Sequence, residues 1–250
     1  MDAAFARCQR DDFLRDRRCH ERRGSQTVLL SNISLLWLRY PLVALGNYLT
    51  YTPSQVKMCS AGKWGSIHPR NLVPHFETSP NEGMTMCISL VKKTDDSSEF
   101  ILAGGYESGH TCVYSVSSTC WSTIYSSRAH SQPVLSLAIH PSQQCVFTSS
   151  ADANLVQHPT VLATQPIKVV NSKHSGQTGL SIRDDGRILV TAGWDGCGRV
   201  YSATTLKQVA VLKWHVDGLQ ATCFSQNENG KRWLIMGGKD GKLTLWDVFN

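Results

Sequence analysis

The sequence twice places a histidine, a threonine and an aspartate at spacings that could serve nucleophilic catalysis. The two sets are His130, Thr148 and Asp152, followed one period later by His174, Thr191 and Asp195. An imidazole, a hydroxyl and a carboxylate are the parts of a catalytic triad. An enzyme needs one such set, however, and a set that recurs in successive segments is typical of a repeated structural element. We therefore predict buried hydrogen-bond networks here, and no enzyme, catalytic residue, cofactor site or metal site.

The elements that position these residues recur with a nearly fixed period. An acid closes a run of small residues at Asp152, Asp195 and Asp240, and Ser108 stands one period earlier, so the intervals are 44, 43 and 45 residues. A histidine precedes each of the three acids, at His130, His174 and His215. Six residues after the four turn positions stand Tyr114, His158, Tyr201 and Trp246. A period of this length that closes on Trp246-Asp247 is typical of the WD repeat, which forms one four-stranded blade of a β-propeller.

We predict an all-β fold with four recognisable propeller blades. In the third period, a hairpin turn at Asp184–Gly186 separates the first two of four expected strands, which are 177–183, 187–194, 199–202 and 209–213. The four blades are predicted at 84–128, 129–172, 173–213 and 214–250.

Each blade is expected to bury one polar network. The aspartate orients the imidazole, the imidazole bonds a strand hydroxyl, and an aromatic ring covers both groups. The predicted members are His130, Thr148, Asp152, His174, Thr191, Asp195, Tyr201, His215, Asp240 and Trp246. Three departures from the pattern predict weaker networks, namely Ser108 for the acid in the first blade, His158 for the aromatic in the second and Met236 for the hydroxyl in the fourth.

The residue before each turn acid is a candidate for protein binding. In propellers this position faces the rim of the central channel, and here it holds Glu107, Ala151, Trp194 and Lys239. A large aromatic beside charged residues is the composition of a protein-binding face, because aromatic anchors carry much of the binding energy. We predict a partner face of Tyr106, Glu107, Trp194 and Lys239. The alternative, that these are only solvated turn residues, stays open.

The net charge of +6 does not indicate nucleic acid, because residues 1–75 carry +6 and residues 76–250 carry zero. A nucleic-acid-binding domain concentrates positive charge on its folded binding face. The basic arm Arg15–Arg23 would be the alternative, but Asp16 and Glu21 interrupt it and favour a solvated segment. We therefore expect no direct nucleic acid partner.

Two further features argue against a metal centre and a membrane span. The nine cysteines contain no C-x-x-C pair, which favours a reducing compartment, and Cys8, Cys19 and His20 fit no zinc spacing. The segment 28–51 is apolar, but Arg39 and Pro41 stand at its centre. A central arginine costs about 2.5 kcal/mol or more on insertion, so we expect no membrane span.

Three segments resemble the ASTRA-associated WD-repeat family, whose animal counterpart is the G-protein β-subunit-like protein. They are Ala103–His110, Thr191–Asp195 and Gly237–Asp247, and the resemblance covers about 84–250. It implies a non-catalytic scaffold in a nuclear ASTRA assembly, a chromatin-remodelling component that also serves kinase maturation. The implied partners are the Pontin and Reptin ATPases and the cochaperone of phosphatidylinositol-kinase-like kinases. A generic WD-repeat adaptor, a cytoplasmic location, G-protein-β-like signalling and a hydrolase remain as alternatives.

The resemblance also raises the question of how the ring is completed, because such relatives have about seven blades. Residues 1–83 are too few for three more and carry no marker in phase, so we expect a basic, partly disordered segment or a degenerate blade. The last blade ends after its third strand, and 27–30 or 34–39 could supply a fourth. The expected product is an N-terminally truncated or replaced relative, either an open blade array or a marginally stable one.

Overall fold

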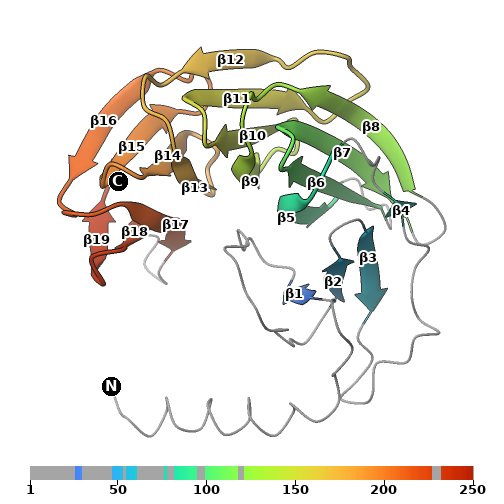
Figure 1. The fold of residues 1–250 in the computed structure, drawn as a ribbon, viewed down its shortest axis with the longest axis horizontal. Coiled ribbons are helices and arrows are strands. Elements are labelled where there is room, and N and C mark those ends of the chain that lie inside the picture. Colours follow the sequence, from blue (N-terminus) through green and yellow to red (C-terminus); the bar gives the residue numbers. More distant parts are fainter. Residues whose placement is uncertain are drawn as a thin grey trace, which may run out of the picture.

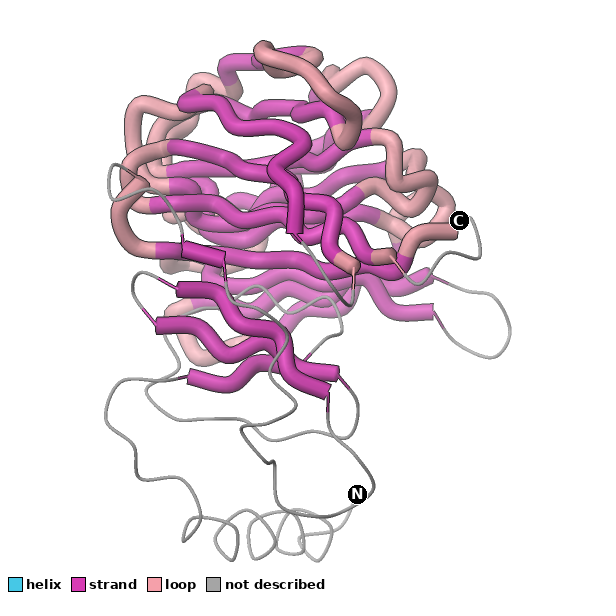
Figure 2. The backbone as a smooth tube through the Cα atoms, turned by 90° about the vertical axis from the view of Figure 1, so that its right-hand side faces the viewer, coloured by secondary structure: helices cyan, strands magenta, loops and turns pink. Residues whose placement is uncertain are grey.

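The computed structural model describes residues 82–94, 99–117, 121–226 and 232–249, together with the backbone of four earlier strands. Its described elements are antiparallel sheets that follow one another along an arc (Figure 1). Seen from the side, the strands of successive sheets lie in layers (Figure 2). The all-β propeller architecture predicted from the repeats is confirmed.

Four sheets correspond to the four predicted periods, and we call them blades I to IV. Blade I contains β5 (Thr85–Lys92), β6 (Phe100–Tyr106), β7 (His110–Val116) and β8 (Trp121–Arg128). Blade II contains β9 (Val134–Ile139), β10 (Cys145–Ser150), β11 (Asn154–Pro159) and β12 (Lys168–Asn171). Blade III contains β13 (Gln177–Ile182), β14 (Ile188–Gly193), β15 (Cys197–Ser202) and β16 (Gln208–Lys213). Blade IV contains β17 (Leu219–Gln226), β18 (Arg232–Gly238) and β19 (Leu243–Asp247).

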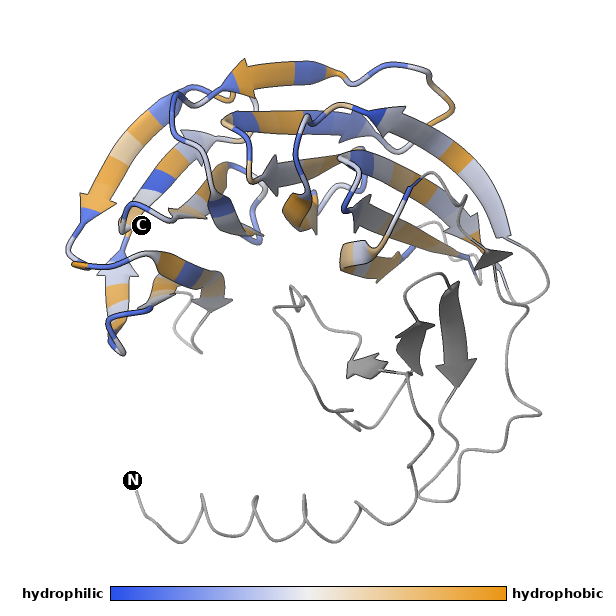
Figure 3. Cartoon of the chain, in the orientation of Figure 1, coloured by the Kyte–Doolittle hydropathy of each residue, from blue (hydrophilic) through white to orange (hydrophobic). Residues whose placement is uncertain are grey.

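The apolar strand sequences form these sheets because both faces of a blade pack against neighbours. The β14 sequence ILVTAG, for example, is buried from its second residue to its last. Such a continuous apolar run suits a strand that is covered on two sides. Figure 3 shows hydrophobic residues running through the strands of all four blades.

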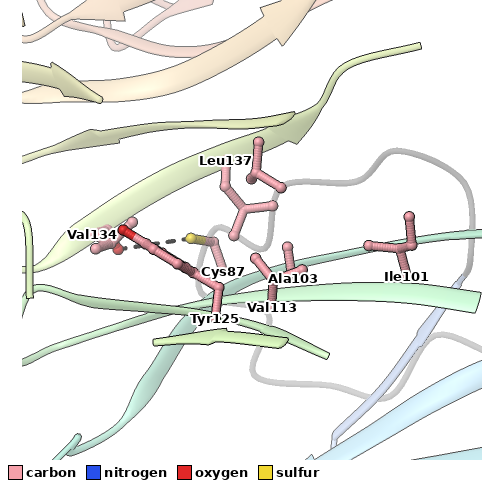
Figure 4. Packing of buried hydrophobic residues seen from close by; sticks show 8 residues of the cluster. Cys87, Ile101, Ala103, Val113, Tyr125, Val134 and Leu137 are labelled. Atoms are coloured by element: carbon pink, nitrogen blue, oxygen red, sulfur yellow. Dashed lines mark hydrogen bonds between the residues drawn. The ribbon is translucent and has the colours of Figure 1, made fainter. Parts of the chain in front are cut away.

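The hydrophobic cores lie between consecutive blades. Between blades I and II, Cys87, Ala103 and Val113 pack against Val134 and Leu137 (Figure 4). Equivalent clusters join blade II to III and blade III to IV. The first strand of each blade contacts the first strand of the next, which fixes the inner edge of the arc. The turns that carry the candidate site therefore stand on a rigid frame.

A further four-stranded sheet precedes blade I. It contains β1 (Gln26–Leu29), β2 (Asn47–Thr52), β3 (Gln55–Ser60) and β4 (Phe76–Glu77), in that order. β1 pairs with β2, from Gln26 opposite Tyr51 to Leu29 opposite Tyr48. The expectation that residues 27–30 could complete the last blade is not borne out, because β1 belongs to this sheet and not to that of β17–β19. The alternative segment 34–39, the arm Arg15–Arg23 and the trio Cys8, Cys19 and His20 lie outside the described residues.

The part of the chain that the structure describes holds no helix long and apolar enough to cross a membrane.

The C-terminal end of blade IV is held against blade III by Arg183. Nη1 of this side chain donates to the carbonyl oxygens of Val248 and Phe249 at 3.0 and 2.9 Å. Nη2 donates to Asp185 Oδ2 at 2.7 Å, so the buried guanidinium is paired as well as hydrogen-bonded. Blade IV is thereby fixed against blade III.

Candidate functional site

Blade II buries a continuous chain of hydrogen bonds. His130 Nδ1 lies 3.1 and 3.2 Å from the two carboxylate oxygens of Asp152. Thr148 Oγ1, on β10, lies 2.8 Å from His130 Nε2 and 2.8 Å from His158 Nε2. His158 Nδ1, on β11, lies 3.0 Å from the hydroxyl of Tyr125 on β8 of blade I. The predicted contacts of His130, Thr148 and Asp152 are therefore present.

The carboxylate fixes the direction of every bond in this chain. An ionised Asp152 can only accept, so His130 Nδ1 donates to it and His130 Nε2 accepts from the Thr148 hydroxyl. Thr148 Oγ1 then accepts from Nε2–H of His158, and Nδ1 of His158 accepts from the Tyr125 hydroxyl. In this tautomer each donor has one acceptor. A buried network in which every member is satisfied rigidifies its surroundings.

The ionisation states agree with this direction. Burial alone would raise the pKa of Asp152, but hydrogen bonds from His130 and from the backbone N–H groups of Asn154 and Ser131 hold it below its ordinary value. Burial, with a smaller contribution from the neighbouring His130, lowers the pKa of His158 to about 3. Asp152 is therefore charged and His158 neutral at physiological pH.

His158 is a full member of the blade II network, although an aromatic residue was expected at its position. An imidazole has a second nitrogen, and this nitrogen reaches Tyr125 in the neighbouring blade. The two rings also pack together, with their centroids 5.4 Å apart. The substitution therefore extends the network across a blade boundary.

Blade IV builds the same network with a displaced hydroxyl. His215 Nδ1 lies 3.0 Å from Asp240 Oδ1, and Thr244 Oγ1 lies 2.9 Å from His215 Nε2. Trp246 Nε1 donates to the same Thr244 oxygen at 2.9 Å. Thr244 on β19 is the register partner of Met236 on β18. With Met236 at the expected hydroxyl position, the hydroxyl of this network comes from the adjacent strand.

Blade III does not form the predicted network. The side chain of His174 is 49% exposed, and its Nδ1 is 3.8 Å from Asp195 Oδ2. Asp195 instead receives both terminal nitrogens of Arg199, one of them at 3.0 Å. A guanidinium that is always charged and bidentate binds a carboxylate more strongly than an imidazole does. His174 is therefore left at the surface.

The remaining predicted members of blade III, Thr191 and Tyr201, lie close together but without His174. The Thr191 hydroxyl donates to Gln177 Oε1 at 2.7 Å, so glutamine takes the place of histidine. Tyr201 is buried in the core between blades II and III. Its hydroxyl lies beside the side chains of Thr191 and Ser172. The ring therefore contributes packing.

Blade I has Ser108 in place of the turn acid, and its hydrogen bonds join residues that are close together in the sequence. Ser108 Oγ lies 2.8 Å from His110 Nδ1, two residues away. Tyr106 is completely buried, and its hydroxyl lies 2.9 Å from that of Tyr114. The assignment of Tyr106 to a partner face is wrong, because its position on β6 points the ring into the core.

The other predicted rim residues occupy equivalent positions in the four blades. Each donates its backbone N–H to a carbonyl oxygen before the first strand of its own blade. These bonds join Glu107 to Met84 at 2.8 Å, Ala151 to Pro133 at 3.1 Å, Trp194 to Gly176 at 2.9 Å and Lys239 to Gly218 at 2.8 Å. Glu107, Trp194 and Lys239 are exposed. The arrangement presents an aromatic ring and a positive charge on the neighbouring turns of blades III and IV, and a negative charge on the turn of blade I.

The Trp194 ring rests on Gly176. A Cβ atom built on Gly176 would lie 2.1 Å from Cε3 of the Trp194 ring, and the backbone φ of Gly176 is +74°. Trp194 is 49% exposed, and the covered side of its ring contacts Gly176. A large side chain that is already ordered loses less conformational entropy on binding.

We expect Gly176→Ala to displace the Trp194 ring and to lower the free energy of unfolding by more than Gly241→Ala does. Gly241 has nearly the same φ, +73°, but nothing lies within 4 Å of a Cβ at that position. Both variants lose about 1 kcal/mol of stability because alanine disfavours a positive φ. Only the new Cβ of Gly176→Ala also clashes with the Trp194 ring. Equilibrium denaturation of both variants measures the difference. Equal losses would show that Trp194 does not depend on Gly176.

Several residues of these networks were not predicted from the sequence, although some left a signal. Arg199 stands four residues after Asp195, within reach across the turn. Thr244 stands two residues before Trp246 on the same face of β19. Gln177 and Tyr125 carry no local signal, because their roles depend on contacts between distant segments.

Comparison with known proteins agrees with the repeat architecture. The family described as WD domain, G-beta repeat, matches residues 121–157, 164–202 and 206–247. The chain is 39% identical over 217 residues to ASTRA-associated protein 1 of Verticillium alfalfae, covering 70% of this chain and 53% of the relative. It is 34% identical over 243 residues to the protein of that name from Aspergillus niger, with 69% and 55% covered. It is 37% identical over 172 residues to ASTRA-associated protein 1 of Schizosaccharomyces pombe, covering 62% of this chain and 45% of the relative. The chain thus spans about half the length of these relatives.

Proposed function

We propose that this chain, which carries WD repeats and is similar to the fungal ASTRA-associated proteins, is a non-catalytic scaffold whose exposed rim turns bind other proteins. The observation that carries the proposal is the equivalence of Glu107, Trp194 and Lys239, which stand on the same backbone hydrogen bond in their blades. Trp194 offers an ordered aromatic anchor between neighbouring turns. Tryptophan is among the residues most enriched in binding hot spots.

The polar networks support a structural role for the residues that resemble catalytic triads. His130 and Thr148 are completely or almost completely buried, and every donor in the blade II chain already has its acceptor. A nucleophile must reach its substrate, and the Thr148 hydroxyl is enclosed between two imidazoles. In blade III, where His174 is exposed, Thr191 is bonded to Gln177 instead. Neither set supplies an accessible hydroxyl beside a general base.

We further propose that the scaffold belongs to an ASTRA assembly in the nucleus. The similarity to proteins named ASTRA-associated protein 1 supports this assignment. The expected partners are the Pontin and Reptin ATPases and the cochaperone of phosphatidylinositol-kinase-like kinases. With these partners the chain would act in chromatin remodelling and in the maturation of those kinases.

Affinity purification of the full chain tests both proposals. The double variant Trp194→Ala, Lys239→Glu is expected to reduce recovery of bound partners by at least about tenfold, because the loss of one hot spot costs about 2 kcal/mol or more. The matched control is Leu162→Ala, Lys207→Glu, which changes the same kinds of exposed side chain on outer hairpins. Equal recovery from folded double variant and wild type would remove the proposed face. A different set of partners would withdraw the ASTRA assignment and leave the scaffold.

A further inference from the structure

Four loop segments form a continuous strip of surface at one end of blades II to IV, which we call the rim strip. Its segments are 172–176, 194–196, 214–218 and 239–241. The backbone N–H of Trp194 donates to the carbonyl oxygen of Gly176 at 2.9 Å, and that of Lys239 donates to Gly218 at 2.8 Å. A Cβ atom built on Gly218 would lie 2.8 Å from the carbonyl oxygen of Trp194. Loop 214–218 therefore contacts the turns on both sides of it.

Two apolar side chains of the rim strip are exposed although their backbone is fixed. Trp194 is 49% exposed and lies against Gly176, and Val216 is 84% exposed on the next loop. The N–H of Val216 donates to Asp240 Oδ2 at 3.4 Å, and the neighbouring His215 is bonded to the same carboxylate. A side chain that is presented on ordered backbone loses less conformational entropy when it binds. Trp194 and Val216 therefore offer two apolar contacts to a partner.

The charge that the rim strip offers to a partner is positive. Together with the residues that flank them, its segments hold five lysine and arginine residues against three aspartates in 172–176, 194–199, 213–218 and 239–242. Asp195 accepts two bonds from the guanidinium of Arg199, and Asp240 accepts a bond from the imidazole of His215. Four exposed lysines form no ion pair within the described residues, and they are Lys173, Lys213, Lys239 and Lys242. The rim strip therefore complements a negatively charged partner.

An acidic protein segment fits this surface better than a phosphate-bearing ligand does. Recognition of phosphate commonly uses the planar fork of an arginine, but Arg199 is buried and already donates to Asp195. The cations that face solvent are lysines, and the exposed side chains of Trp194 and Val216 lie among them. Glu107 occupies the equivalent turn of blade I, so an acidic segment is repelled there and binds on blades II to IV.

On the basis of the function proposed above, we propose that the rim strip binds an acidic segment of a partner protein. The apolar side chains of this segment pack on Trp194 and Val216. Its aspartate and glutamate carboxylates pair with Lys173 and Lys239, which lie on opposite sides of the two apolar contacts.

Fluorescence anisotropy with the full chain and a labelled synthetic peptide tests this partner chemistry. The probe is a short peptide in which glutamates alternate with leucine and phenylalanine. We expect it to bind the wild type. The double variant Lys173→Glu, Lys239→Glu and the single variant Val216→Ser should each raise Kd at least about tenfold, through like-charge repulsion and the loss of an apolar contact respectively. The matched control Lys92→Glu, Lys207→Glu reverses two exposed lysines at the opposite end of the strands and should bind like the wild type.

Three outcomes would overturn the proposal. They are a wild type that does not bind the acidic peptide, equal affinity for a peptide in which lysine replaces glutamate, and equal affinity for one in which serine replaces leucine and phenylalanine. Circular dichroism checks that each variant is folded before the affinities are compared.

Failure of the proposed function gives a different result. In that case the variant Trp194→Ala, Lys239→Glu retains all its partners in the affinity purification. If this variant loses its partners while the wild type does not bind the acidic peptide, the rim turns bind a partner of other chemistry, and only the acidic segment is withdrawn.

Discussion

His130→Ala lowers the free energy of unfolding by about 3–5 kcal/mol, whereas His174→Ala changes it by less than about 0.5 kcal/mol. The two histidines occupy the same place in consecutive repeats, but only His130 is buried and hydrogen-bonded on both ring nitrogens. Its removal takes the acceptor from Thr148 and one donor from Asp152 in a region closed to water. Unsatisfied buried groups are costly because they cannot regain their bonds to solvent.

Equilibrium denaturation in urea, followed by tryptophan fluorescence, measures both losses. His174→Ala is the matched control, because it deletes the same side chain from a half-exposed position. His215→Ala should resemble His130→Ala, since His215 is also bonded to an aspartate and a threonine. If all three variants lost equal stability, the burial of the network would not govern its contribution.

The repeat period was sufficient to predict the blades, because hydrophobic alternation and turn residues are local signals. The predicted strand 177–183 ends one residue beyond the observed β13, and 209–213 begins one residue after the start of β16. The pairing of β1 was not predictable in the same way. Residues 27–30 were recognised as a strand, but whether such a strand joins β2 or β19 depends on tertiary contacts between distant segments.

The polar networks show where the same reasoning stops. A histidine and an aspartate at the expected spacing do pair in blades II and IV. In blade III the spacing is retained, but Asp195 binds Arg199 and not His174, because the guanidinium is charged and forms two parallel hydrogen bonds to the carboxylate. In blade IV the expected strand hydroxyl is missing, yet Thr244 restores it from the opposite strand. Spacing identifies which groups could meet, and the competition among all neighbouring groups decides which of them do.

Tyr106 illustrates a related limit. Its sequence position beside Glu107 suggested the rim, but successive strand residues point to opposite sides of the sheet. Glu107 begins the exposed turn, while Tyr106 is the last residue of β6 and turns inward to Tyr114. A shift of one residue therefore separates a surface side chain from a core side chain.

Acidification from pH 7 to pH 4.5 is expected to destabilise the fold through His158. Burial lowers the pKa of His158 to about 3 in the folded chain, and its ordinary value is 6.5. The unfolded chain therefore binds a proton below pH 6.5 that the folded chain does not bind. Stability falls as the pH drops through 6.5, with a slope that approaches about 1.4 kcal/mol per pH unit until the folded pKa is reached.

The physical reason is that the folded His158 has no nitrogen left for a second proton. Nε2 donates to Thr148, and Nδ1 accepts from the Tyr125 hydroxyl, so protonation at Nδ1 breaks the bond between blades I and II. The carboxyl of Asp152 contributes in a lower window. Its pKa is below the ordinary 3.8, so its contribution is complete above that value and is lost only as the pH falls further. Between pH 6.5 and pH 4.5 the effect of His158 can be measured separately.

Denaturation curves at several pH values distinguish this effect from general acid sensitivity. His158→Phe removes the titrating group while keeping a ring, so its unfolding free energy should change with pH by about 2 kcal/mol less than that of the wild type between pH 6.5 and pH 4.5. The pH dependence of the unfolding free energy is compared, and not its absolute value, because the hydrogen bonds lost in His158→Phe lower the stability equally at every pH. Parallel curves for wild type and His158→Phe would mean that the buried imidazole does not resist protonation.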